Sequence, residues 1–423
     1  MGAVAARRAP PAGAPAPRPR HRRHRRRGRR RGVRGGRARA VSAPRVLLVG
    51  AHGHGRGHLQ RLRRFADAGR LELAGVCDTT APDPELAALS GTAPWTDDLD
   101  VALRRARPDV VVVVTPIPTH APIGLAALAA GADLLLEKPP TATWAEFQQL
   151  QRAAAAAGRS VQVGFQSLGS QALPAVVADV AAGRIGTLRG IGATGTWQRG
   201  SGYWDRAPWA GRRTLDGRPV VDGALTNPFA HAVATALRLD GSEDADSLTS
   251  VELELHRANP IEADDTSCLR LRTARGTTVV VAVTLCAATA REPAVVLHGS
   301  RGTATVRYTR DEVTWSTPEG TAVEQHTRRD LLEDLLAHRE DPAAPLLVPL
   351  ERTAAFATVL EAVRTAPDPR PVPPELVEVL DEEDGQRRVV RGVDELVAAA
   401  AQRLATFSEL DPRWAPAAAP VTG

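Results

Sequence analysis

From Arg45 to about Gln166, short apolar runs alternate with longer segments whose apolar residues recur at helical spacing. The short runs predict strands, at residues 45–50, 71–77, 109–114, 132–137 and 161–165. The last of the helical segments between them follows a capping box, Thr143-x-x-Glu146, and ends at Gly158. The run at 109–114 is apolar on both faces, as a central strand of a parallel sheet must be. This alternation predicts an α/β fold with a doubly wound parallel sheet.

The pattern changes beyond residue 167, where apolar and polar residues alternate along several strand-like runs. The alternating runs are residues 187–197, 251–256 and 268–272; residues 277–285, 294–299 and 303–308 are also strand-like, with hairpin turns at 274–276 and 300–302. Alternation with a period of two predicts an antiparallel sheet with one solvated face. The second domain is therefore expected to be α+β, with a large, open, mainly antiparallel sheet.

The remaining segments predict helices at 328–339, at 352–364 and from about Val393 to Phe407, with a stiff Pro-rich linker at 367–374. The domains are expected at 45–166 and 167–366, with a tail at 1–44 and a linker and C-terminal helix at 367–423. No apolar run approaches the roughly 20 residues that span a bilayer, so a soluble protein is expected.

Charge is distributed unevenly along the chain. Residues 1–44 contain 15 arginines and no acidic residue, whereas the net charge of the whole chain is only +6. The Pro, Gly, Ala and Arg composition of this tail predicts disorder. Two interpretations of it stay open: contact with nucleic acid through its arginines, or a leader that is not translated. Cys77, Cys268 and Cys286 lie in strand-like runs without zinc spacing, which predicts buried thiols in a reducing cytoplasm.

The first turn reads GAHGHGRGH over residues 50–58. It follows a predicted strand and opens a predicted helix, which is the context of a dinucleotide-binding turn. With Gly50 as the first glycine of G-x-G-x-x-G, the third falls on Gly55 and the second on His52. We expect Gly53 to supply the close backbone approach that His52 cannot, while the helix N-terminus binds the pyrophosphate.

Two further features of this region refine the expectation. Asp78 follows the second strand, where a carboxylate accepts the ribose hydroxyls of NAD and repels the 2′-phosphate of NADP. A simple strand-end cap is the alternative, and Thr79 and Thr80 leave NADP open. His52, His54 and His58 could suggest a metal site, but we assign His52 and His54 to the cofactor turn and predict no metal, because a cofactor phosphate already occupies this loop.

Lys138 is the only lysine among the 54 lysine and arginine residues of the chain. Arginine stays charged at any useful pH, whereas a partly buried lysine can lose or share its proton. Lys138 follows the strand at 132–137, at the sheet edge where open α/β folds bind ligands. We predict a role that a guanidinium cannot fill. A buried ion pair with Glu137 is the alternative, and the two can coexist.

The motif Glu137-Lys138-Pro139 at a strand end resembles the signature of the glucose-fructose oxidoreductase/inositol dehydrogenase (Gfo/Idh/MocA) family. The stretch VVTPIPTHAPIGLAALAAGADLLLEKP (113–139) and VGFQ (163–166) are similar to it as well, so the resemblance covers about residues 45–365. It implies a Rossmann domain, then an α/β domain whose sheet often forms a subunit interface. It also implies NAD(P)-dependent oxidation of sugars or polyols, or the reverse reduction, by a homodimer or homotetramer.

The resemblance also implies roles for single residues. Besides the glycine turn and Asp78, the cofactor-binding positions would be Thr115, Pro116, His120, Glu137, Lys138 and Gln166. The family's D-x-x-x-H pair matches Asn227 and His231, so an amide replaces the acidic residue. Asp222 lies just upstream and could partly replace the missing carboxylate.

These residues suggest a chemistry for the site. His231 would be the general base in alcohol oxidation and the acid in carbonyl reduction. Lys138 would hydrogen-bond the same oxygen and relay its proton, and Asn227 would orient a substrate hydroxyl. The nicotinamide would carry the hydride.

The loop at 197–213 is rich in aromatic and hydrogen-bonding residues, which suit a sugar ring. Its candidates for substrate binding are Tyr203, Trp204, Arg206 and Trp209, with a packed loop or a dimer contact as the alternative. The favoured function is a cytoplasmic NAD(P)-dependent dehydrogenase or reductase. A cofactor-binding sensor that lost turnover on the same fold is the alternative.

Overall fold

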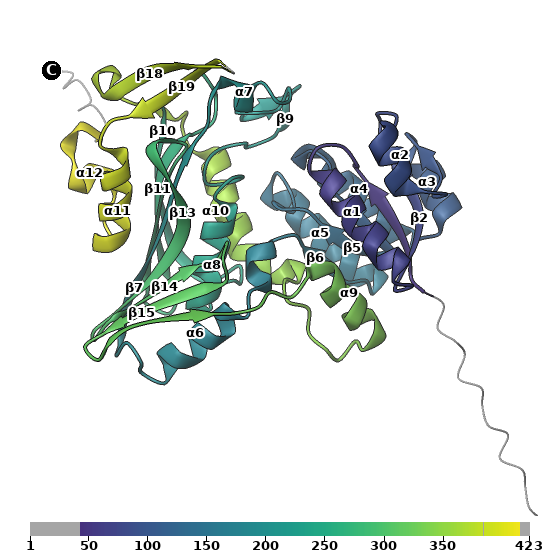
Figure 1. Ribbon diagram of the computed structural model, residues 1–423, viewed down its shortest axis with the longest axis horizontal. Coiled ribbons are helices and arrows are strands. Elements are labelled where there is room, and N and C mark those ends of the chain that lie inside the picture. Colours follow the sequence, from purple (N-terminus) through teal and green to yellow (C-terminus); the bar gives the residue numbers. More distant parts are fainter. Residues whose placement is uncertain (1–42, 384, 415–423) are drawn as a thin grey trace, which may run out of the picture. The chain divides into compact units, whose positions relative to one another are not determined.

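The computed structural model describes residues 43–383 and 385–414 (Figure 1). The predicted basic tail lies outside the described residues except for Ala43 and Pro44. None of the helices in the described ranges has both the length and the apolar composition needed to cross a membrane.

Six parallel strands form the first sheet, in the order β3-β2-β1-β4-β5-β6. The four residues of β4 are completely buried, as the all-apolar run predicts. From β1 the strand order runs one way to β2 and β3 and the other way to β4, β5 and β6. Open α/β sheets bind ligands at such a switch point. The strands are β1 Arg45–Val49, β2 Glu72–Cys77, β3 Trp95–Thr96, β4 Val110–Val113, β5 Asp133–Leu136 and β6 Val161–Val163.

The helices that connect these strands follow the sequence signals closely. The predicted capping box before α5 is present, and Gly158 ends that helix in the left-handed conformation. Asp83 and Asp98 cap α2 and α3 with their side chains. The helices are α1 His54–Asp67, α2 Pro84–Ser90, α3 Leu99–Ala106, α4 His120–Ala129 and α5 Trp144–Ala157.

Nine strands form the second sheet, in the order β16-β15-β14-β13-β7-β12-β11-β10-β17. Two neighbouring pairs, β12 with β7 and β10 with β17, are parallel, and the rest are antiparallel. The predicted fold class is therefore confirmed. The strands are β7 Leu188–Gln198, β10 Leu248–Arg257, β11 Thr266–Thr273, β12 Thr278–Thr284, β13 Cys286–Gly299, β14 Thr303–Arg307, β15 Glu312–Thr317, β16 Gly320–Gln325 and β17 Arg370–Pro371.

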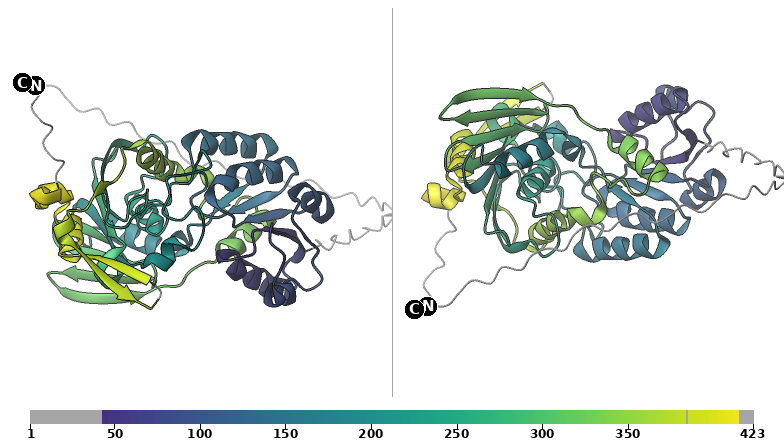
Figure 2. Two further views of the ribbon diagram at one scale, coloured as in Figure 1. Left: turned by 90° about the horizontal axis from the view of Figure 1, so that it is seen from above. Right: turned by 90° about the horizontal axis from the view of Figure 1, so that it is seen from below.

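Helices cover this sheet on both faces (Figures 1 and 2). On one face lie α6 Ala172–Ala181, α8 Ala230–Asp240 and α10 Ala354–Thr365. The helix α9 Leu331–Glu340 instead contacts the first sheet, where Gln162 of β6 donates to Asp334 at 2.7 Å. Gln162 also accepts from the backbone N–H of Val348 at 2.9 Å. These buried hydrogen bonds fix the second domain against the first.

The C-terminal segment differs from the prediction in three ways. The expected linker at 367–374 contains β17, which joins the edge of the large sheet. A hairpin of β18 Val377–Glu382 and β19 Gly385–Val390 follows, which the charged, weakly periodic sequence did not indicate. The last long helix, α11 Val393–Arg403, ends before the predicted Phe407, because Leu404 adopts the left-handed conformation; a short helix, α12 Phe407–Leu410, follows.

A second hydrophobic core lies between α11 and the outer face of the large sheet. Small residues on β7 permit this contact, since a Cβ on Gly192 would lie 2.1 Å from the carbonyl oxygen of Ala401. Cys268 and Cys286 belong to this core, and with Cys77 they are free and buried, as predicted. The C-terminal segment is thus an integral part of the second domain.

Candidate active site

The predicted site residues of the first domain follow the carboxyl ends of neighbouring strands. Gly50 follows β1, Asp78 follows β2, Thr115 follows β4, Lys138 follows β5 and Gln166 follows β6. Because these strands are parallel and adjacent, the fold brings all five residues to one sheet edge.

Two glycines of the first turn cannot carry a side chain. A Cβ on Gly50 would lie 2.4 Å from the carbonyl oxygen of Val114, and one on Gly55 would lie 2.2 Å from that of Gly50. Gly53 precedes α1 with φ +55°, and its Cβ position faces open space. These positions match the register with Gly50 first and Gly55 third. The first turn of α1 has no acidic side chain, so its positive end suits an anion.

Asp78 is bound to this turn. Its Oδ2 accepts from the backbone N–H of Ala51 at 2.7 Å and lies 3.0 Å from Nδ1 of His52. Its Oδ1 accepts only the N–H of Thr80 among the described residues. Burial alone would raise the pKa of Asp78, but the two backbone N–H groups and the His52 ring outweigh burial and lower it. A charged carboxylate with free acceptor capacity on Oδ1 is therefore present where a ribose is expected.

Glu137 anchors the turn that carries Lys138. Its Oε1 lies 3.0 Å from Nε2 of His58 and accepts from Gln166 at 2.7 Å, while Oε2 accepts the N–H of Lys138. A Cβ on Gly164 would lie 2.7 Å from Oε1, so only glycine fits beside this carboxylate. Burial works against ionisation, but the His54 and His58 imidazoles hold the pKa of Glu137 well below its usual range.

The same cluster has ligand atoms of the types that bind metal ions. Atoms of His54, His58 and Glu137 lie within 4.8 Å of one another. Three protein ligands match a catalytic rather than a structural zinc site. Because Oε1 of Glu137 is already engaged by His58 and Gln166, we interpret the cluster as an anchor for the Lys138 turn.

His120 bridges the two turns that face this edge. Its Nδ1 lies 2.8 Å from the carbonyl oxygen of Pro139, and its Nε2 lies 2.8 Å from that of Thr115. Burial lowers its pKa. Thr115 also packs against Gly50, since the methyl group of Thr115 lies 2.8 Å from the Cβ position of that glycine. His120 thereby lies between the two turns, and its neutral imidazole, which carries one N–H, can donate to only one of the two carbonyl oxygens at a time.

The amine of Lys138 reaches across to the second domain. Its Nζ donates to the side-chain oxygen of Asn227 at 2.6 Å and to the Asn227 backbone oxygen at 3.1 Å. Burial lowers the pKa of Lys138; the Glu137 and Asp222 charges oppose this effect and the Arg206 charge adds to it. A protonated amine has three donors, so one remains for a ligand. A neutral amine can keep both contacts to Asn227 and offer its lone pair instead.

Asp222 stands behind Asn227 as a second layer. Asn227 donates its amide hydrogen to Oδ1 of Asp222 at 2.5 Å, and Arg206 donates to Oδ2 at 2.9 Å. The guanidinium of Arg206 lies over the rings of Tyr203 and Trp209, at 3.8 and 4.6 Å from their centroids. The structure thus connects three of the predicted substrate residues to Lys138 through Asp222. This arrangement fixes which end of the Asn227 amide faces the lysine.

His231 lies on α8, one turn after Asn227. Burial and the positive charge of Lys138 lower the pKa of His231 to about 3, so the imidazole is neutral at pH 7. Its Nδ1 lies 3.2 Å from the hydroxyl oxygen of Ser167, which in turn accepts from Thr235. The hydroxyl pair fixes the orientation of the ring.

Sequence reasoning missed the residues that support this site. His58 and Ser167 orient Glu137 and His231, yet each is the neighbour of a predicted residue: His58 lies one helical turn after His54, and Ser167 follows Gln166. Trp204 contacts Tyr203, with ring centroids 4.9 Å apart, and lines a cavity that Arg206 also lines.

The chain matches one family over both of its domains. Residues 44–165 match the model of an oxidoreductase family with an NAD-binding Rossmann fold, GFO/IDH/MocA. Residues 175–305 match the model of the C-terminal domain of that family.

Curated relatives match mainly over part of the chain. An inositol 2-dehydrogenase of Saccharopolyspora erythraea is 38% identical over 122 residues, which cover 29% of this chain and 36% of the relative. A D-glucoside 3-dehydrogenase of Escherichia coli is 31% identical over 134 residues, which cover 30% of this chain and 38% of the relative. The chain thus spans less than half the length of these relatives.

Solved structures share the fold over most of the chain. The WlbA dehydrogenase of Bordetella pertussis, in complex with NADH and UDP-GlcNAcA, has a TM-score of 0.62 and 23% identity, covering 76% of this chain and 95% of its own. A UDP-N-acetylglucosamine 3-dehydrogenase of Acidithiobacillus ferrooxidans has a TM-score of 0.60 and 21% identity, and the match covers 76% of this chain and 97% of that structure. At these identities the likeness establishes the fold.

The glycine turn yields a matched pair of variants. Gly55→Ala is expected to weaken NADH binding at least tenfold and to lower the unfolding temperature, because its Cβ would collide with the Gly50 carbonyl oxygen. Gly57→Ala, on the same helix and facing open space, should stabilise the protein by about 0.5–1 kcal/mol. NADH fluorescence titration and thermal unfolding check both variants. Equal effects in the two would contradict the proposed packing of the turn.

Proposed function

Because the chain belongs to the Gfo/Idh/MocA family of NAD-binding oxidoreductases, we propose that it transfers hydride between nicotinamide and a secondary alcohol, or the corresponding carbonyl, of a sugar or cyclitol. The observation that carries this proposal is the contact of Lys138 with Asn227: the only lysine of the chain is desolvated at the predicted ligand-binding edge. Relatives named inositol 2-dehydrogenase and D-glucoside 3-dehydrogenase support this substrate class.

The glycine turn fits a dinucleotide. Gly50 and Gly55 permit the tight turn, and the open space at Gly53 lies beside the uncrowded N-terminus of α1. The Asp78 carboxylate favours NAD over NADP, because it would repel a 2′-phosphate. The side chain of His52, which stands where the family motif has its second glycine, leaves less room for the pyrophosphate to approach the turn. When bound, the nicotinamide supplies the hydride acceptor in oxidation and the donor in reduction.

Lys138 would manage the proton of the reacting hydroxyl. In alcohol oxidation the neutral amine accepts a hydrogen bond from that hydroxyl, and the lowered pKa of Lys138 makes this form accessible. In carbonyl reduction the protonated amine donates its third N–H to the carbonyl oxygen and stabilises the developing negative charge. Asn227 holds the amine in place in both directions, since it accepts from two N–H groups.

His231 would take the proton from this centre or return it. Its imidazole is uncharged at neutral pH, so one ring nitrogen has a free lone pair. When Nδ1 carries the hydrogen and donates to Ser167, Nε2 is the basic atom. Lys138 and His231 then share the work of general acid and base.

We further propose that the protein works as a homo-oligomer in a reducing cytoplasm, which suits its three buried thiols. Part of the outer face of the large sheet is covered by α11. A subunit interface on this sheet would therefore have to use strands that α11 leaves uncovered. Light scattering of the purified full chain tests the oligomeric state.

Turnover is tested directly with a panel of inositols, hexoses and their oxidised forms, followed by nicotinamide absorbance. We expect at least one compound to be turned over by the natural protein. Lys138→Arg should bind NADH normally and lose turnover by about 10²–10⁴-fold, because a guanidinium cannot release the proton. The control Arg159→Lys, on an exposed turn, should keep full activity. Full activity in Lys138→Arg would remove the catalytic role, and a silent panel with bound cofactor would favour the sensor function.

Asn227→Asp places a carboxylate directly beside the lysine. The new negative charge favours the protonated amine. The pKa of Lys138 should therefore be higher in the variant than in the natural protein, where Glu137, Asp222, Arg206 and His231 surround the amine. The limb of the pH–rate profile that reports this lysine should move to higher pH, for oxidation and for reduction alike. Gln402→Glu adds the same charge on the exposed side of α11 and should leave the profile unchanged. An unmoved limb in Asn227→Asp would mean that another group titrates.

A further inference from the structure

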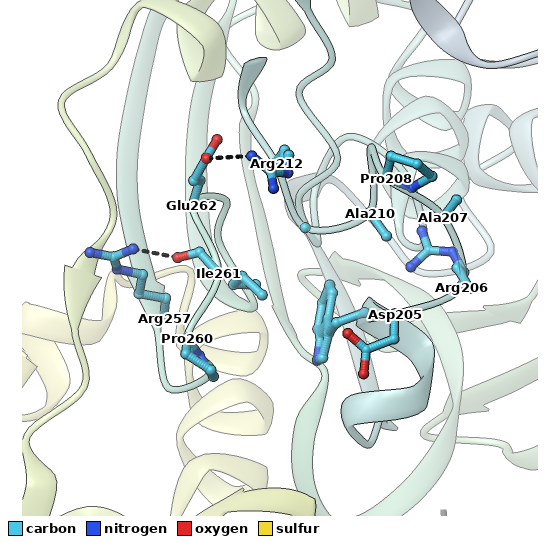
Figure 3. A pocket seen from close by; sticks show the side chains of 12 residues that line it. Asp205, Arg206, Ala207, Pro208, Ala210, Arg212, Arg257, Pro260, Ile261 and Glu262 are labelled. Carbon is cyan, nitrogen blue, oxygen red and sulfur yellow. Dashed lines mark hydrogen bonds and ion pairs between the residues drawn. The ribbon is translucent and has the colours of Figure 1, made fainter. Parts of the chain in front are cut away.

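A cavity of about 860 Å³ opens beside the network that leads to Lys138 (Figure 3). Its two walls are the segment after the short helix α7 Ser201–Trp204 and the loop at 257–262 after β10. Asp205 and Arg206 lie on one side of the cavity, and Arg257 and Glu262 lie on the other. This volume lies within the usual range for small-molecule sites, about 300–1,000 Å³.

The cavity shares one residue with the candidate active site. Arg206 lines it and also donates to Asp222, which is bound to Asn227 and through it to Lys138. Two side chains, Asp222 and Asn227, therefore lie between Arg206 at the cavity and the amine of Lys138. This hydrogen-bonded path links a group bound at the cavity to the position of Lys138.

The arginines of the cavity differ in how well their charges are compensated. Arg206 pairs with Asp222 at 2.9 Å, and Arg212 lies 3.4 Å from Glu262. Arg257 forms no ion pair within the described part of the chain, and its guanidinium donates to the carbonyl oxygen of Ile261. A guanidinium has five N–H donors, so most donors of Arg257 remain for a ligand. An uncompensated, half-buried guanidinium favours an oxyanion as its partner.

The C-terminal segment holds both walls of the cavity in place. Arg257 pairs with Pro371 of β17, and its carbonyl oxygen accepts from the N–H of Val372 at 2.9 Å. On the other wall, the N–H of Gln386 in β19 donates to the hydroxyl of Ser201 at 3.1 Å. These contacts come from residues beyond the two family matches, which end at residue 305. The lining of the cavity itself lies inside the second family match, whereas the segment that supports it lies outside.

We propose that this cavity is a subsite for an anionic group of the substrate, a carboxylate or a phosphate, with Arg257 as the residue that selects it. The proposal rests on the dehydrogenase function proposed above and narrows its substrate class to acidic or phosphorylated sugars. Trp204 supplies an aromatic wall against which the apolar face of a sugar can pack. Arg212 also lines the cavity, and its charge is partly compensated by Glu262.

Calorimetry on the NADH-loaded full chain tests this subsite with three probes: glucose, glucuronate and glucose 6-phosphate. NADH occupies the glycine turn, so the phosphate of the probe cannot bind there. At least one anionic probe should bind about 10- to 100-fold more tightly than glucose, which is the range expected for hydrogen bonds to a charged group. A preference for glucuronate identifies a carboxylate, and a preference for glucose 6-phosphate identifies a phosphate.

Arg257→Gln should remove this preference and leave glucose binding unchanged, whereas Arg257→Lys should keep part of it because the charge remains. Arg301→Gln, which removes an exposed arginine on a turn of the large sheet, is the control and should behave like the natural protein. Equal affinity for all three probes in the natural protein would overturn the proposal even if Arg257→Gln failed to fold. A preference that survives in a folded Arg257→Gln protein would overturn it too.

The same experiment separates this subsite from the proposed activity, because calorimetry needs no turnover. Tight anion binding through Arg257 together with a silent absorbance panel would retain the subsite and remove the dehydrogenase function. Turnover of neutral polyols that does not depend on Arg257 would retain the dehydrogenase function and remove the subsite.

Discussion

The hydrogen bond between the Lys138 amine and the Asn227 side chain joins the two domains at the point where chemistry is expected. An amine taken out of water loses part of the solvation that stabilises its charged form. The surrounding residues limit this loss: Glu137 and Asp222 bring negative charge, and Asn227 provides two acceptors. The remaining features of the site follow from the need to hold one lysine in this position. Glu137 is anchored by His58 and Gln166, and Asn227 is anchored by Asp222.

Placing an amide between the lysine and the nearest second-domain carboxylate changes the electrostatics of the centre. A carboxylate at position 227 would attract the ammonium directly, and this attraction falls with distance. Asp222 instead acts through Asn227 and shares its charge with Arg206. The lysine therefore stays easier to deprotonate than beside a direct ion pair. Asp222 also connects the aromatic loop to the lysine through hydrogen bonds to Arg206 and Asn227. A substrate that contacts this loop can therefore influence the position of the Lys138 amine.

The sequence predicted those parts of the molecule that local patterns determine. Apolar runs, capping residues and glycines located the parallel sheet, and a single lysine among arginines pointed to the centre of the site. The hairpin of β18 and β19 was missed because its strands are exposed and charged, so that no hydrophobic period marks them. Support from Asp222 at the Asn227 position was expected, but its pairing with Arg206 and the role of Arg257 depend on tertiary contacts that no local pattern shows. No spacing rule could reveal that Arg206 compensates one carboxylate while Arg257 has none.

The lysine count makes the central claim measurable at one atom, since ¹³C-labelled lysine gives a single side-chain signal in the whole protein. Following the Cε resonance through a pH titration of the NADH-bound protein reports the pKa of Lys138 itself. The account predicts a pKa below the ordinary value for lysine, about 10.4 in model peptides. It also predicts that the signal follows the ordinary lysine value once the protein is unfolded. A folded-state titration at or above that ordinary value would contradict the claim that desolvation prepares this amine to release its proton.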